Sequence, residues 1–232
     1  MIKFFNSFSS KNPKVLSISV PFLNNINVGT ATAIISGKGN YTGNVSRTFR
    51  IDPANISSVS LSTTVYTYSG TIKTPMVTVN ADGLLAASKI TKDTSNIDVT
   101  YSSGRKNVGI YKVTVKGIGN FTGTLNKTFT INPKGTSISK VSGAKKAFTV
   151  KWKKQSAKMA TSTITGYQIR YSTSSKMTSA KTKTVKGYKY TSKKITKLSA
   201  KKKYYVQIRT YKTVSGKAYY SSWSGVKSVK TK

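Results

Sequence analysis

Side chains that could catalyse a reaction are scarce in this sequence of 232 residues. It has no histidine and no cysteine, and its only acids are Asp52, Asp82, Asp93 and Asp98. A Ser-His-Asp triad, and zinc sites built on imidazole or thiolate, are therefore excluded. A catalytic carboxylate pair would need two of these aspartates, which lie in a repeat ending, a turn, a Ser/Thr-rich loop and a strand start. We expect no enzyme activity, no metal and no cofactor.

Basic side chains are the abundant chemical groups. The formal net charge is +36, from 40 basic and 4 acidic residues. Residues 134–232 hold 26 of the 40 bases and none of the acids, which predicts an anionic partner for this part. Of the bases, 35 are lysines, which lack the planar fork of arginine. This composition favours diffuse attraction to a polyanion over sequence-specific binding to DNA.

Short lysine clusters are the candidate polyanion-binding residues. They are Lys145, Lys146, Lys153, Lys154, Lys193, Lys194, Lys201, Lys202 and Lys203. Charge runs are usually turns that simply face solvent. Because no acid in residues 134–232 offsets the repulsion, binding to a polyanion is an equally open interpretation.

One tryptophan lies beside residues that could stack on it. Trp223 falls in a Tyr-Tyr-Ser-Ser-Trp-Ser segment that we expect to form the last strand. Arg170 and Arg209 should point outward from their strands, and stacking on the indole would contribute about 0.5–1 kcal/mol per exposed contact. The alternative is a sugar-stacking platform together with Tyr205 and Tyr211. We favour the structural interpretation, because such cation–π pairs are common in proteins.

A tandem repeat must position part of these residues. Residues 27–53 and 107–133 share a pattern of glycines, aromatics and a closing proline, and Gly29 corresponds to Gly109 at a constant shift of 80 residues. In each copy apolar and polar residues alternate, as in a strand with one buried face. The expected inward positions are Ala31, Ala33 and Ile35 in the first copy, and Tyr111, Val113, Val115, Leu125, Phe129 and Ile131 in the second.

Three features of the repeat have competing interpretations. The Gly117–Gly123 loop has G-x-G-x-x-x-G spacing and no helix after it, so we predict a hairpin turn rather than a phosphate cradle. Asn40 and Asn120 match the glycosylation pattern, yet we expect turn asparagines. Lys127 and its match Arg47 fall on the inward side, and we expect both near a strand end with the charge reaching water.

The repeat divides the chain into four segments. Residues 1–16 match nothing else, 17–53 form a partial repeat, 54–133 a complete repeat, and 134–232 a different domain. The abundance of Thr, Ser, Val, Tyr and Ile predicts an all-β chain of tandem β-sandwiches. The partial repeat lacks its earlier strands, which indicates a chain that begins inside a domain and predicts unpaired strand edges and bare apolar surface.

The complete repeat resembles a known family. Tyr66-Thr-Tyr-Ser-Gly, Thr74-Pro-Met-Val-Thr-Val, Asn107-Val-Gly, Gly119-Asn-Phe-Thr-Gly and Thr128-Phe-Thr-Ile-Asn-Pro133 resemble the bacterial immunoglobulin-like repeats of Firmicute surface proteins, clostridial ones among them. That resemblance covers roughly residues 17–133. It implies a secreted or wall-attached multidomain protein, and it carries no shared catalytic site.

Residues 134–232 resemble a fibronectin type III domain. Alternating apolar residues surround Trp152, and Leu198 precedes Tyr204 by six. The resemblance implies that Trp152 anchors the core and that Leu198 and Tyr204 form a tyrosine corner. The family usually has a proline where this chain has Ala200. The lysine-rich sequence and its Tyr-Ser-Ser-Trp-Ser ending are similar to C-terminal modules of secreted clostridial proteins.

Three functional hypotheses follow. The leading one is a non-catalytic extracellular or cell-wall-associated module whose repeats are spacers and whose basic domain binds an anionic cell-wall polymer or polysaccharide, with other domains of a longer parent protein as further partners. The second is a carbohydrate-binding accessory of a secreted hydrolase. The third, nucleic-acid binding, is less favoured because most aromatics fall at predicted core positions. No segment has 18 consecutive apolar residues, so we expect no membrane span, and no signal peptide is visible.

Overall fold

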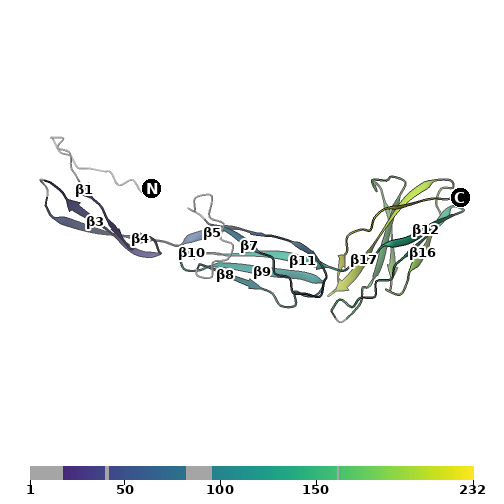
Figure 1. Cartoon of the computed structure of the whole chain (residues 1–232), viewed down its shortest axis with the longest axis horizontal. Coiled ribbons are helices and arrows are strands. Elements are labelled where there is room, and N and C mark those ends of the chain that lie inside the picture. The colour runs from purple at the N-terminus through teal and green to yellow at the C-terminus, as the bar shows by residue number, and fades with distance from the viewer. Residues whose placement is uncertain (1–17, 40–41, 82–95, 161) are drawn as a thin grey trace.

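The computed structural model describes residues 18–39, 42–81, 96–160 and 162–232. All regular secondary structure in these ranges is β, which confirms the all-β prediction. Figure 1 shows three groups of strands arranged in a row, with the partial repeat at one end and the lysine-rich domain at the other. Among the described residues, no helix is long and apolar enough to cross a membrane.

The first unit is a single antiparallel sheet. Strands β1 and β2 both pair with β3, and β4 pairs with β3 alone. Their bounds are β1 Ile18–Ser19, β2 Phe22–Leu23, β3 Gly29–Gly37 and β4 Asn44–Ile51. Within the described ranges no second sheet covers this one, so its apolar side chains remain largely accessible.

The second unit is a two-sheet sandwich. One sheet has the order β10-β5-β7 and the other β6-β11-β9-β8. The strands are β5 Ala54–Leu61, β6 Val65–Thr67, β7 Val77–Ala81, β8 Ile97–Tyr101, β9 Gly109–Gly117, β10 Phe121–Thr122 and β11 Thr124–Asn132. Apolar residues of both sheets form one core, with Val79 on one side and Val113 and Phe129 on the other.

The repeat is visible in the strand register. Gly29 pairs with Ile51 in the first unit, and Gly109 pairs with Ile131 in the second. The hairpin expected at Gly117–Gly123 is present: Gly117 N–H donates to Gly123 O at 2.9 Å, and a Cβ at Gly117 would lie 2.7 Å from the backbone nitrogen of Thr122. Close backbone approach therefore requires glycine there.

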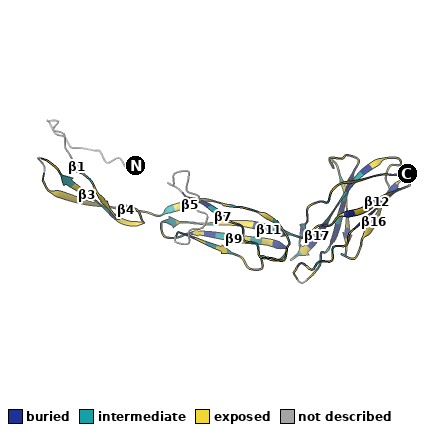
Figure 2. Ribbon diagram, in the orientation of Figure 1, coloured by how far each residue is buried: buried dark blue, intermediate teal, exposed yellow. Residues whose placement is uncertain are grey.

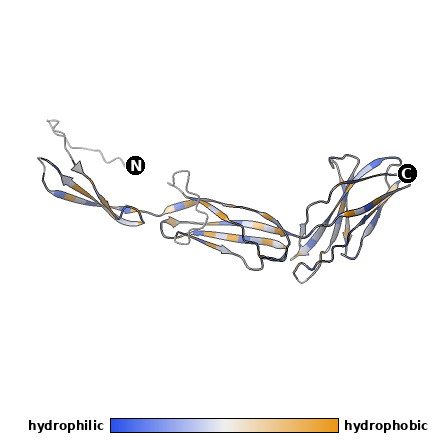
Figure 3. Cartoon of the chain, viewed as in Figure 1, coloured by the Kyte–Doolittle hydropathy of each residue, from blue (hydrophilic) through white to orange (hydrophobic). Residues whose placement is uncertain are grey.

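Equivalent positions of the two copies differ in burial. Val113, Val115, Phe129 and Ile131 are buried as expected, and Tyr111 and Leu125 are partly buried. In the first copy Ala31 is buried and Ala33 partly so, but the prediction for Ile35 is wrong, since it is 38% exposed. Figure 3 shows apolar residues on β3 and β4, whereas Figure 2 shows β4 mostly exposed and β3 largely of intermediate burial. The reason is that β5 and β7 close the second core, and no described strand does so in the first.

The prediction that Lys127 and Arg47 lie near strand ends is also wrong. Both are in the middle of their strands, Lys127 opposite Val113 and Arg47 opposite Ala33. Strand β6 pairs with β11 only from Thr130 onward, so Lys127 lies on an open sheet edge. Both charged side chains are exposed. An inward-directed lysine on an edge discourages pairing with another chain.

The third unit is a second sandwich, of which one sheet has the order β12-β13-β16 and the other β15-β14-β17-β18, with β19 also paired to β17. The strands are β12 Ile138–Ala144, β13 Ala147–Trp152, β14 Gly166–Ser172, β15 Lys181–Lys186, β16 Ser192–Ile195, β17 Lys203–Val214, β18 Lys217–Tyr220 and β19 Lys227–Lys230. Its core is rich in aromatic residues, with Phe148, Trp152 and Tyr167 at its centre.

Two joints connect the three units. At the first, Asn120 accepts a hydrogen bond from Val28 N–H at 2.8 Å and donates to Asn27 Oδ1 at 2.8 Å. At the second, Val108 is 2% exposed and belongs to the hydrophobic cluster of the third unit, against which Tyr68 also packs. Val28 and Val108 are equivalent in the repeat, so the same loop contacts the following unit at both joints.

Candidate functional site

The residues assigned to the core of the third unit lie together. Trp152 is 3% exposed and its ring centroid is 5.2 Å from that of Tyr167. Tyr204 is 8% exposed, and its hydroxyl accepts a hydrogen bond from Ser199 N–H at 3.2 Å. Leu198 packs partly buried against the same cluster. The phenol therefore holds the turn before β17, as in a tyrosine corner.

Trp223 is not on a strand, so the prediction of a last strand there is wrong. It lies between β18 and β19. The serines around it take the place of backbone acceptors: Ser221 Oγ accepts from Thr210 N–H at 3.0 Å, and Ser224 Oγ accepts from Ile208 N–H at 3.1 Å. These side-chain bonds interrupt the regular backbone hydrogen bonding beside β17. They place the indole over the outer face of the sheet.

The indole of Trp223 contacts two guanidinium groups. Arg170 Cζ lies 4.5 Å from the ring centroid and Arg209 Cζ lies 4.3 Å from it. Both guanidinium groups therefore lie over the indole within cation–π range. Arg209 Cζ also lies 4.0 Å from the ring centroid of Tyr220, whose ring centroid is 6.0 Å from that of Tyr211. We call Arg170, Trp223, Arg209 and Tyr220 the ladder.

Two glutamines fix the guanidinium groups. Gln207 Oε1 accepts from Arg170 Nε at 2.9 Å and from Nη2 at 2.6 Å, and Gln168 Oε1 accepts from Arg209 Nε at 2.8 Å. Burial lowers the pKa of Arg209 below its ordinary value, and the nearby positive charge of Arg170 lowers it further, while Tyr220 acts in the opposite direction. Residues 134–232 contain no acidic side chain to offset these charges.

The ladder gives Trp223 a different role from a sugar platform. Two guanidinium groups already lie over the indole, so they compete with a pyranose for the ring. Tyr211 is buried and reaches the ladder only through Tyr220. Tyr205 lies on the same sheet face, opposite Ser172, with Lys203 Nζ 5.4 Å from its ring centroid.

The nine candidate lysines are all exposed, and the fold brings only some of them together. Lys145 and Lys146 form the hairpin turn between β12 and β13, and Lys201, Lys202 and Lys203 precede or begin β17. Backbone bonds join these segments to the C-terminus, from Lys146 N–H to Lys232 O at 2.9 Å and from Thr231 N–H to Lys202 O at 3.0 Å.

We call these lysines the basic end of the third unit. Lys203 is the direct cross-strand neighbour of Lys230, which adds a further charge. The basic end consists of Lys145, Lys146, Lys201, Lys202, Lys203, Lys230 and Lys232. Lys193 and Lys194 instead lie on the edge strand β16, opposite Val150 and Thr149. Lys153 and Lys154 lie at the other end of β13.

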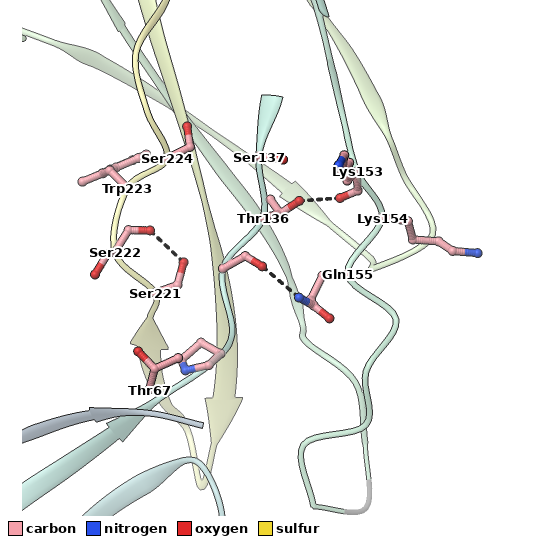
Figure 4. A pocket seen from close by; sticks show the side chains of 12 residues that line it. Thr67, Thr136, Ser137, Lys153, Lys154, Gln155, Ser221, Ser222, Trp223 and Ser224 are labelled. Atoms are coloured by element: carbon pink, nitrogen blue, oxygen red, sulfur yellow. Dashed lines mark hydrogen bonds between the residues drawn. The ribbon is translucent and has the colours of Figure 1, made fainter. Parts of the chain in front are cut away.

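A cleft of about 510 Å³ lies where the third unit meets the second. Its lining is mostly polar: Thr67, Pro133, Gly135, Thr136, Ser137, Lys153, Lys154, Gln155, Ser221, Ser222, Trp223 and Ser224. Figure 4 shows that Thr136, Gln155 and Ser221 already donate to backbone carbonyls, and that the Lys154 side chain extends away from Ser221 and Gln155. The hydroxyl and amide donors of these three residues are therefore already used within the protein.

Lys212 is buried, whereas lysine side chains usually lie at the surface. Lys212 is 5% exposed, and its Nζ donates to Ser162 O at 2.8 Å, Ser162 Oγ at 2.6 Å and Thr163 O at 2.9 Å. Burial lowers the pKa of Lys212 below its ordinary value. The ammonium ties the segment before β14 to β17 and is not available to a partner. Sequence reasoning missed it because its neighbours alternate as in an ordinary strand.

The aspartates do not form a site among the described residues. Asp52 pairs with Arg50 at 2.6 Å, with both side chains exposed, and Asp98 lies on β8 opposite Lys116. Asp82 and Asp93 lie outside the described residues, as does Asn40. In the described ranges, no three His, Cys, Asp or Glu residues cluster as metal ligands would.

Sequence reasoning found Arg170, Arg209 and Trp223 but missed Tyr220, both glutamines and the serines. The alternation along β14 and β17 could have placed Gln168 and Gln207 on the same face as the arginines. The pairing of Gln168 with Arg209, and of Arg170 with Gln207, depends on the register between the strands. The sequence alone does not supply that register.

The third unit, with its two sheets, buried tryptophan and tyrosine corner, matches the fibronectin type III domain over residues 131–226. Residues 131–226 are a fibronectin type III domain. The match ends just before β19, and the fibronectin type III domain contains the whole ladder. Together with the sandwich of residues 54–133, it makes the chain a tandem of β-sandwich domains. No curated protein matches the chain.

Two solved structures are similar over most of the chain. Chicken CNTN1 FN1-FN3 domains have 16% identity and a TM-score of 0.37, with 87% of this chain and 77% of that chain covered. Domains A168-A170 from titin have 15% identity and a TM-score of 0.31, with 88% and 75% covered.

Proposed function

We propose that this chain is an extracellular, non-catalytic module whose repeats act as spacers and whose fibronectin type III domain binds anionic polymers of a bacterial cell envelope. The observation that carries the proposal is the charge asymmetry. Residues 134–232 contain 26 basic residues and no acidic one. Such a surface attracts polyanions over long range, in a manner that salt weakens.

The arrangement of the lysines supports this proposal. All seven lysines of the basic end are exposed, and they come from the β12–β13 hairpin, the start of β17 and the C-terminus. Folding therefore concentrates charge that is dispersed in the sequence. Residues 134–232 contain no Asp or Glu, and the ion pair found in the described part of the chain, Arg50–Asp52, lies in the first unit.

The two guanidinium groups over Trp223 disfavour an accessory module that binds neutral sugars by stacking on this ring. Binding to nucleic acid is a separate outcome that the test below distinguishes. Stacking of bases on exposed aromatic residues is the usual requirement for single strands. In the fibronectin type III domain most aromatic residues instead belong to the core.

The test is retention of the full chain on purified bacterial cell walls, with and without their anionic polymer, at two salt concentrations. We expect retention to fall when the polymer is removed and to fall again when salt rises, because released counterions drive such binding. Retention that changes neither with removal of the anionic polymer nor with salt concentration would overturn the proposal. Equal competition by duplex DNA and by soluble wall polymer would indicate a general polyanion binder instead.

A charge-matched pair of variants locates the surface. Lys146→Gln, Lys201→Gln and Lys202→Gln together remove three charges from the basic end, and Lys106→Gln, Lys112→Gln and Lys116→Gln remove three exposed charges from the second unit. We expect the first triple variant to reduce retention and its salt dependence, and the second to change both far less. Equal losses would indicate that net charge alone matters.

A further inference from the structure

The ladder presents two cations whose remaining donors face solvent. Apart from the bonds to Gln207 and Gln168, the described residues provide no partner for Nη1 of Arg170 or for either Nη of Arg209. None of these nitrogens is among the buried polar atoms without a partner in the described part of the chain. They are therefore accessible to a ligand at the outer face of the sheet.

The guanidinium planes are held in place before any ligand arrives. Each one stacks on the indole and is fixed at Nε by a glutamine carbonyl, so little rotational freedom is left to lose. A fixed guanidinium fork binds a carboxylate through two parallel hydrogen bonds. An anion would also relieve the repulsion between Arg170 and Arg209, which both lie over the Trp223 ring. These are the only arginines among the 26 bases of residues 134–232.

The surroundings of the ladder favour a polymer with hydroxyl groups. Thr182 and Thr184 on β15 are the direct cross-strand neighbours of Arg170 and Gln168, respectively. Both threonines therefore lie on the same sheet face as the ladder, and both are exposed. Hydroxyl and amide groups beside two fixed cations suit a chain of sugars that carry carboxylates on successive units.

From this geometry we infer that Arg170 and Arg209 form an oxyanion-binding site for an acidic polysaccharide, with each guanidinium holding one carboxylate of the polymer. The inference rests on the proposed function, because it assigns one specific contact within a surface that otherwise attracts polyanions diffusely. Trp223 is then a positioning residue, which spaces the two guanidinium groups and does not itself contact sugar.

The test measures the affinity of the full chain for polygalacturonate at fixed salt, with dextran as the neutral control. R170K/R209K keeps the net charge but removes both forks, and R47K/R50K makes the same change at exposed arginines of the first unit. We expect R170K/R209K to weaken binding about tenfold or more, because charge-assisted hydrogen bonds are lost. R47K/R50K should bind as the unchanged chain does.

A second measurement uses the unchanged chain and therefore does not depend on the folding of a variant. The chain has five arginines, so NMR resolves five Nε–Hε groups. Polygalacturonate should shift those of Arg170 and Arg209 and leave those of Arg47, Arg50 and Arg105 in place. Equal shifts in all five, or none, would overturn the inference.

The outcomes separate the inference from the proposed function. If the unchanged chain binds no polyanion, both fail. If it binds with steep salt dependence but R170K/R209K binds equally well, only the ladder site fails. If R170K/R209K loses affinity for polyphosphate as much as for polygalacturonate, the site recognises oxyanions in general and the assignment to an acidic polysaccharide is overturned.

Discussion

At the scale of single residues, Tyr167 shows how a buried polar group stabilises the fibronectin type III domain. Its side chain is fully buried, and its hydroxyl accepts from Gln155 N–H at 2.9 Å and donates to Tyr188 O at 2.8 Å. It therefore ties the segment after β13 to the loop after β15. Burial raises the pKa of Tyr167 above its ordinary value, and the bond from Gln155 opposes this more weakly.

Replacing Tyr167 by Phe should cost about 1–3 kcal/mol of unfolding free energy at neutral pH, because two buried backbone groups lose their partner. The pH dependence should change as well. Because the pKa of Tyr167 is higher in the folded chain, the unfolded chain releases this proton first as pH rises past about 10. The contribution of Tyr167 to the free energy of unfolding is therefore complete below the pKa of the unfolded chain and is lost as pH rises above it. Y167F should lose stability less steeply there.

Denaturant unfolding at pH 8 and at pH 10.5 would measure both effects. Tyr190→Phe is the matched control, since Tyr190 is 61% exposed and should change neither quantity. An unaltered stability of Y167F at pH 8 would contradict the role assigned to the two hydrogen bonds.

At the scale of strands, alternation predicted the hairpins of both repeats and the central strands of the fibronectin type III domain. It missed β5, because the register shifts between Ile56 and Ser58. The bulge leaves Ile56 and Val59 both inward although they are three residues apart, which breaks the period of two. The prediction for the segment around Trp223 failed for a related reason. Serine hydroxyls there accept hydrogen bonds from the β17 backbone in place of the carbonyls of a regular strand.

Burial is the other property that strand pattern cannot supply. Ile35 and Val115 occupy the same repeat position, yet Ile35 is 38% exposed and Val115 is fully buried. Whether a second sheet covers a strand depends on residues distant in the sequence. The ladder shows the same restriction. The sequence pattern identified its arginines, but their glutamine partners follow from the register between β14 and β17, which the pattern does not give.

A pair of substitutions tests this difference directly. Val115→Thr buries a hydroxyl in a closed core and should cost about 1–3 kcal/mol, whereas Ile35→Thr should change stability by less than about 0.5 kcal/mol. Hydrogen exchange of the β9 and β3 amides would report each unit separately. A comparable loss of protection in β3 would show that the first sheet is covered in solution.

Like charges face each other across strands of the fibronectin type III domain. Lys140 on β12 is the direct neighbour of Lys151 on β13, and both are exposed. Lys140→Glu should therefore stabilise the domain by about 0.2–1 kcal/mol through an opposite-charge pair. Thermal unfolding at low salt would show the gain, and at 1 M salt, where the screening length is about 3 Å, most of it should vanish. Lys106→Glu, in a loop of the second unit, is the control.

At the scale of the whole molecule, the two joints use the same loop but differ in strength. Val28 is 40% exposed and is held at the first joint by its backbone bond to Asn120. Val108 is 2% exposed within the core cluster of the fibronectin type III domain. Buried apolar contact resists bending more than two exposed hydrogen bonds do, since water can replace the latter. The second joint should therefore be the stiffer one.

Relaxation of backbone ¹⁵N nuclei measures the tumbling of each unit. In the unchanged chain, the second unit and the fibronectin type III domain should tumble together, with the first unit moving more freely. Val108→Ser should decouple the two sandwiches, because it removes apolar area from the joint. Val28→Ser should have little effect, because the bond to Asn120 comes from the backbone, whereas Asn120→Ala should free the first unit further. Independent tumbling of the two sandwiches before any substitution would contradict a joint built on Val108.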